Sequence, residues 1–146
     1  NKLILAGKSD FSIVQELEPS VVCKYRLISN KNKSMWFVYS QNICKSRSLV
    51  SPEDIVTDDK QMTYQGYIKV GDDNKYHFAI GKKGNQNYNK QSIKALLWIL
   101  NRKNYDIPGV VKIYHHGVCS LCGRKLSDPI SLRYGIGPTC RERLGL

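Results

Sequence analysis

The chain has 146 residues, of which 41% are hydrophobic, and its 23 Lys and Arg against 12 Asp and Glu give a formal net charge of +11. This length fits one compact domain, or a domain of about 110 residues with an appendage. No apolar run approaches the roughly 18 residues of a membrane span, which predicts a soluble protein. Because the N-terminus does not resemble a secretory signal, we expect a cytoplasmic location.

Strands are predicted for the first part of the chain, after a short apolar start at residues 2–6. Residues 21–27 alternate between apolar and polar side chains, which predicts a strand with Lys24 and Arg26 on its polar face. Residues 35–39 are apolar on both faces and predict a central strand. We expect Cys23 and Cys44 to be reduced, with Cys23 as a small core residue.

A hairpin and a helix are predicted next. Residues 64–70 and 75–80 flank Gly-Asp-Asp-Asn at 71–74, a strong turn signal between two strands. The helix spans about 90–103, with Asn89 as its N-cap and apolar residues at helical spacing. A last strand at 110–114 then leads to the C-terminal segment.

The C-terminal segment contains a cysteine and histidine pattern typical of a zinc site. Cys119 and Cys122 form a Cys-x-x-Cys pair, which presents two thiolates to one ion, and Cys140 follows within reach. A tetrahedral site needs one more ligand, and either His115 or His116 supplies it. The alternative, a redox pair or a disulfide, usually begins a helix after a strand, and no long helical pattern follows here. We therefore predict one structural zinc ion, whose closed Cys3His set leaves no position for catalysis.

The same segment resembles a family. The run His-x-Gly-x-Cys-x-x-Cys-Gly-Arg, followed by Gly-x-Gly-Pro-x-Cys, is similar to a small zinc-binding domain of unknown function found in phage and other mobile-element proteins. The resemblance covers residues 115–143 only. It favours His115 over His116 as the fourth ligand, and it implies a phage or mobile-element origin and an association with nucleic acid.

The predicted fold class is therefore α+β: an antiparallel sheet with one main helix, at about 90–103, and a C-terminal zinc knuckle. We expect two parts, a β-rich α+β domain at 1–109 and a zinc-binding module at 110–146 packed on it.

Charge and aromatic content together favour nucleic-acid binding. Residues 1–60 contain nine basic and seven acidic residues, whereas residues 61–146 contain fourteen and five. Such an excess is typical of a polyanionic partner, although a basic surface without one is the alternative. Tyrosines beside cations on one sheet face would stack bases and contact phosphates, which slightly favours single strands over duplexes. The candidate contacts are Lys24, Arg26, Tyr67, Lys69, Lys82, Lys83, Arg124, Lys125, Arg133, Arg141 and Arg143.

Catalysis is not expected. Asp72 and Asp73 suit a hairpin turn, and adjacent aspartates on a strand point to opposite faces and do not converge on one ion. No serine or cysteine has the setting of a nucleophile, so we predict no catalytic residues. The predicted function is a zinc-containing, basic nucleic-acid-binding protein that contacts the phosphate backbone with little sequence specificity. The alternative is a phage accessory protein that binds and inhibits a host protein or defence system, with a purely structural zinc.

Overall fold

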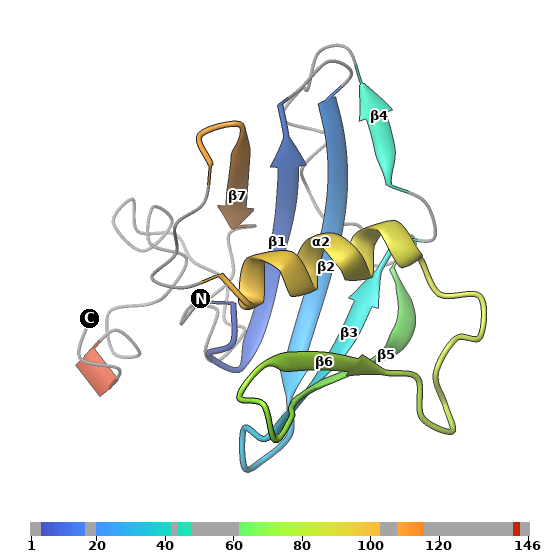
Figure 1. Ribbon diagram of the computed structural model, residues 1–146, viewed down its shortest axis with the longest axis vertical. Coiled ribbons are helices and arrows are strands. Elements are labelled where there is room, and N and C mark those ends of the chain that lie inside the picture. The colour runs from blue at the N-terminus through green and yellow to red at the C-terminus, as the bar shows by residue number, and fades with distance from the viewer. Residues whose placement is uncertain are drawn as a thin grey trace.

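The computed structural model describes residues 4–16, 20–41, 44–47, 62–102, 108–115 and 142–143. Within these ranges one sheet is covered on one face by one helix (Figure 1). The helix is α2 (Lys90–Leu100). The strands are β1 (Lys8–Gln15), β2 (Ser20–Ser29), β3 (Met35–Ser40), β4 (Lys45–Arg47), β5 (Thr63–Val70), β6 (Tyr76–Ala79) and β7 (Val111–His115).

The sheet is antiparallel, with the strand order β6-β5-β3-β2-β1-β7. β4 lies off this path and pairs with the start of β2, at Ser20–Val22, while β3 pairs with the later part of β2, at Tyr25–Ser29. β3 and β4 therefore share one edge of β2. Cys23 lies in β2 between the two pairings, and its disulfide to Cys44 ties the chain before β4 to this point.

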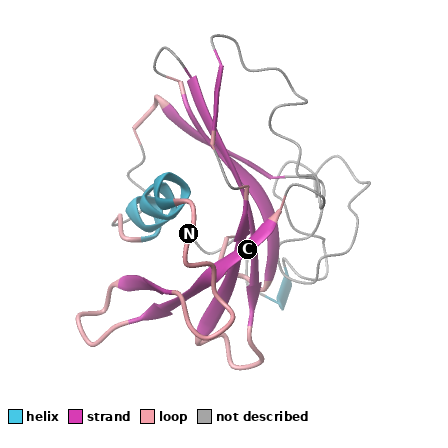
Figure 2. Ribbon diagram, turned by 90° about the vertical axis from the view of Figure 1, so that its right-hand side faces the viewer, coloured by secondary structure: helices cyan, strands magenta, loops and turns pink. Residues whose placement is uncertain are grey.

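The core lies between α2 and the face of the sheet that we call the helix face (Figure 2). Every second residue of β2, from Cys23 to Leu27, is buried there, beneath Ile93, Leu96 and Ile99 of the helix. The helix begins as its sequence predicts, because the Asn89 side chain accepts a hydrogen bond from the backbone N–H of Ser92. It ends at Leu100, three residues earlier than predicted.

A bulge between β3 and β5 changes which residues of β5 face the helix. Val38 pairs with Gly66 but Tyr39 pairs with Tyr64, so Gln65 is the extra residue. Gln65 turns inward and is fully buried, whereas Tyr64 joins Tyr67 on the outer face. The strand passes so close to β6 that a Cβ on Gly66 would lie 2.5 Å from the carbonyl oxygen of Ala79, so only glycine fits.

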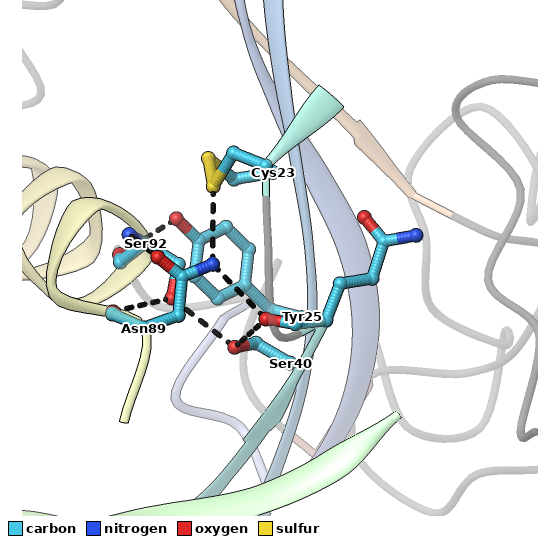
Figure 3. Close-up of a disulfide and its surroundings, with 7 residues drawn as sticks. Cys23, Tyr25, Ser40, Asn89 and Ser92 are labelled. Carbon is cyan, nitrogen blue, oxygen red and sulfur yellow. Dashed lines mark hydrogen bonds between the residues drawn. A yellow bond between two sulfur atoms is a disulfide. The ribbon is translucent and has the colours of Figure 1, made fainter. Parts of the chain in front are cut away.

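The polar side chain of Gln65 is satisfied by a buried network at the start of α2. Its amide donates to the carbonyl oxygens of Ser40 (3.3 Å) and Thr63 (3.1 Å), and its Oε1 accepts from the Asn89 N–H (3.1 Å). The Asn89 Nδ2 donates to Gln41 O at 3.0 Å and lies 3.5 Å from Cys44 Sγ. Figure 3 shows Asn89 pointing from the helix start towards the disulfide. This network fixes the helix to the sheet at one end.

Two predictions about the fold are wrong. The fold class included a C-terminal zinc knuckle, but the described residues contain no group of three or more His, Cys, Asp or Glu that could hold a metal ion. They form an antiparallel sheet with one short helix. Cys23 and Cys44, expected as free thiols, form a disulfide, because β2 and the segment before β4 bring their Cα atoms to 4.7 Å.

Other differences concern single elements. The strand β1 was not predicted, although Phe11, Ile13 and Val14 are all buried. The strand predicted at 110–114 is β7, and it pairs with β1, so the start of the predicted C-terminal part is the edge strand of the main sheet. No helix in the described ranges is long and apolar enough to cross a membrane.

Candidate functional site

Three tyrosines gather on the outer face of the sheet, opposite α2. Tyr39 of β3 and Tyr64 of β5 are cross-strand partners with ring centroids 5.3 Å apart, and Tyr67 lies farther along β5. All three are half-buried, so each ring keeps some of its surface exposed. We call Tyr39, Tyr64 and Tyr67 the tyrosine face. The bulge at Gln65 creates it, because strict alternation would turn Tyr64 towards the helix.

The two neighbouring tyrosines affect the ionisation of Tyr64. Burial raises the pKa of Tyr64, and the neighbouring phenols of Tyr39 and Tyr67 raise this pKa further, since two phenolates would repel each other. The Tyr64 phenol therefore stays neutral well above physiological pH. A neutral phenol offers a ring for stacking and a hydroxyl for hydrogen bonding.

Exposed lysines lie beside the tyrosine face. Lys69 follows Tyr67 by two residues in β5, so it shares the same face of the sheet, and its side chain is exposed. Gly81 passes next to Tyr67, because a Cβ on Gly81 would lie 3.0 Å from the Tyr67 ring. Its φ of 70° is the left-handed conformation that favours glycine. The exposed Lys82 and Lys83 follow directly, so four of the predicted contacts lie at one edge of the sheet.

Two other predicted contacts, Lys24 and Arg26, are poorly placed to contact a phosphate. Lys24 is 4% exposed, in a buried part of the outer face that includes Ser12 and Val22. Arg26 forms a two-pronged ion pair with Asp10, with Nε at 2.6 Å from Oδ1 and Nη2 at 3.1 Å from Oδ2. Ion pairing and burial both oppose a direct phosphate contact, so Lys24 and Arg26 do not belong to the interface proposed below.

The predicted C-terminal basic cluster lies mostly outside the described residues. This is the case for Arg124, Lys125, Arg133 and Arg141. Arg143 is described, and its side chain is exposed.

Of the four predicted zinc ligands, only His115 is in a described range; Cys119, Cys122 and Cys140 are not. His115 is the last residue of β7 and pairs with Phe11. Its Nδ1 is buried without a hydrogen-bond partner in the described part of the chain, and burial lowers the pKa of the imidazole. A neutral imidazole whose buried nitrogen accepts no hydrogen bond from the described residues fits the requirement for a zinc ligand.

We expect Cys122→Ser and Cys140→Ser each to abolish binding of the predicted zinc ion, because each removes one of three thiolate ligands. Metal content of the purified protein, measured by mass spectrometry, checks this. Cys44→Ser serves as the control, since Cys44 is bonded to Cys23 and is not in the predicted set. A full equivalent of zinc in either tail variant would contradict the ligand assignment.

The helix carries an aromatic residue that the sequence analysis did not select. Trp98 is 41% exposed and lies outside the buried stripe of α2. Arg102 lies over its ring, with the guanidinium carbon 4.3 Å from the ring centroid, and Lys94 precedes it by four residues. The signal was present in the sequence: Lys94, Trp98 and Arg102 repeat at a spacing of four, which places them on one side of a helix.

The comparisons with known proteins concern the C-terminal segment. Residues 112–145 match a family of unknown function (DUF6011). The match begins inside β7 and includes the four predicted zinc ligands, but it covers less than half of the chain and assigns no activity. No curated protein and no solved structure matches the chain.

Proposed function

We propose that this chain is a basic, non-enzymatic nucleic-acid-binding protein that holds single-stranded nucleic acid on the tyrosine face. The observation that supports this most is the grouping of Tyr39, Tyr64 and Tyr67 beside Lys69 and the Lys82–Lys83 turn. Aromatic rings accept stacked bases of any sequence, and lysines contact the phosphates that connect them. Such an interface binds with little sequence specificity, because neither contact reads base edges.

The geometry favours a single strand over a duplex. Bases in a duplex are stacked on each other and are not available to a tyrosine ring, whereas the bases of a single strand can be splayed onto a sheet. Tyr39 and Tyr64 lie on adjacent strands and Tyr67 lies three residues along β5 from Tyr64, so successive bases could follow the sheet surface.

The proposal includes one structural zinc ion bound by His115, Cys119, Cys122 and Cys140. A closed set of three thiolates and one imidazole supplies no chemistry beyond holding these residues together. A phage or mobile-element origin rests on the sequence resemblance alone. A cytoplasmic location is part of the proposal, and the Cys23–Cys44 disulfide counts against it, because disulfides are rare in the cytosol.

Fluorescence anisotropy with a labelled single-stranded DNA, the corresponding RNA and a duplex tests the proposal at about 50 and 200 mM salt. We expect single strands to bind more tightly, and binding to weaken steeply with salt because phosphate contacts release counterions. Tyr64→Leu combined with Tyr67→Leu should weaken single-strand binding at least about tenfold, since stacking contributes about 1–3 kcal/mol per base.

A matched pair of charge variants locates the interface. Lys82→Gln with Lys83→Gln should weaken binding and reduce the salt dependence, whereas Lys90→Gln with Lys94→Gln removes the same charge from the helix side and should have little effect. Equal losses in both variants would indicate attraction to the overall charge and contradict the tyrosine face. No binding at the lower salt concentration would overturn the proposed function and favour a protein partner.

A further inference from the structure

A groove of about 410 Å³ lies between α2 and the strands β1, β2 and β7, on the helix side of the sheet. Its volume falls within the range of about 300–1,000 Å³ typical of small-molecule sites. The described lining is mainly apolar and includes Ile13, Val21, Ala95, Trp98, Ile99 and Val111. The tyrosine face lies on the opposite side of the sheet, so this groove is separate from the interface proposed above.

The charge on the described lining of the groove is positive. Lys94 lines it, together with the amides of Gln15 and Gln91, and all three residues are exposed. None of the described lining residues is acidic. Arg102 lies just after the end of α2, with its guanidinium over the Trp98 ring. A ligand in the groove would therefore meet an apolar floor and a cationic, hydrogen-bonding rim.

Trp98 gives a second reason to regard the groove as a binding site. It is one of two tryptophans in the chain and is 41% exposed, and its ring is part of the apolar lining of the groove rather than an isolated surface residue. Val110, also on the lining, is exposed to the same fraction. Covering these two side chains would remove apolar surface from water at the point where the cations lie, which is favourable for a ligand that has both an apolar and an anionic part.

We propose that the groove binds a small amphipathic carboxylate, with an unbranched aliphatic chain along the apolar floor and its carboxylate at Lys94. A neutral lipid would gain no ion pair with the exposed Lys94 ammonium, and a cation would be repelled by it. The inference does not depend on nucleic-acid binding, because it uses neither the tyrosine face nor the Lys82–Lys83 turn.

Titration with decanoate, decanol and decyltrimethylammonium tests the charge preference. Saturable binding of decanoate should shift the tryptophan emission to shorter wavelength, since it removes Trp98 from water, and this shift should be absent in Trp98→Phe. The buried Trp36, whose Nε1 donates to the carbonyl of Leu5, should not respond. Equal binding of all three compounds, or no saturable shift with decanoate, would overturn the proposal.

Three variants locate the site by calorimetry. Lys94→Gln should weaken decanoate binding about fivefold and leave decanol unchanged, as expected for a partly exposed ion pair. Lys90→Gln, on the same helix but outside the groove, is the matched control. Ala95→Phe fills the groove and should abolish binding of both compounds, with circular dichroism to check the fold. Unchanged decanoate binding in Ala95→Phe would place the ligand elsewhere.

A second copy of the chain is the competing occupant of this apolar groove. Sedimentation at increasing protein concentration, without added decanoate, distinguishes the two. A monomer whose Trp98 emission does not change with concentration supports the small ligand. A dimer that forms with the same emission shift, and that Ala95→Phe disrupts, would assign the groove to self-association and overturn the proposal.

Discussion

Replacing Cys23 and Cys44 together by alanine is expected to lower the free energy of unfolding by about 3 kcal/mol. The disulfide closes a loop with a sequence separation of 21 residues, and losing it gives the unfolded chain more conformations. The bond also lies between the part of β2 that pairs with β4 and the part that pairs with β3. We therefore expect the short β4 to be the first strand to separate from the sheet. Urea unfolding of the two proteins, followed by circular dichroism, measures the difference.

Reduction provides the matched control for this prediction. Wild type in the presence of a reductant should unfold at nearly the same urea concentration as the double alanine variant, and the reductant should not affect the variant. Both cysteines are buried, at 3% and 7% exposure, so reduction should be slow in the folded protein. Equal stability of wild type with and without reductant, after full reduction is verified, would contradict a stabilising disulfide.

The second large effect is expected for Gln65→Met, which should lower the free energy of unfolding by about 3 kcal/mol. Methionine has nearly the volume of glutamine, so packing is kept while the hydrogen bonds of the side chain are lost. The Asn89 N–H and the carbonyl oxygen of Ser40 would then be buried without this partner. Leaving buried polar groups unpaired costs more than a hydrogen bond contributes when it forms.

Gln91→Met is the control for this substitution, because Gln91 is exposed on the first turn of α2. The same change there should alter stability by less than about 0.5 kcal/mol. Thermal unfolding of both variants gives the comparison. A Gln65→Met protein as stable as wild type would show that the network at Asn89 does not anchor the helix.

The elements that the sequence predicted are those with a clear local signal. The hairpin around residues 71–74 and the cap at Asn89 depend on turn and capping chemistry, and both are present in the structure. β1 was missed because Ser9 and Ser12 interrupt its apolar pattern, yet both serines are buried. A strand enclosed by β2 and β7 buries polar residues on both faces, and this enclosure is not visible in the strand's own sequence.

The candidate site was predicted only in part for a similar reason. Tyr67, Lys69, Lys82 and Lys83 were selected as polar, exposed residues, and they lie together. Tyr64 was not selected, since a strict period of two puts it on the face opposite Tyr67 and cannot anticipate the extra residue at Gln65. Lys24 was selected from the same alternation, but its burial depends on what covers the outer face.

The sequence by itself determined the antiparallel hairpin, the capped helix, the excess of positive charge and the C-terminal cysteine pattern. Each of these depends on residues close together in the chain, where capping, turn chemistry and composition act. The tertiary structure alone decided the pairing of Cys23 with Cys44, the grouping of Tyr39 with Tyr64, and the groove beneath Trp98. These depend on strand register and on which face the helix covers, and both are set by packing between residues far apart in the chain.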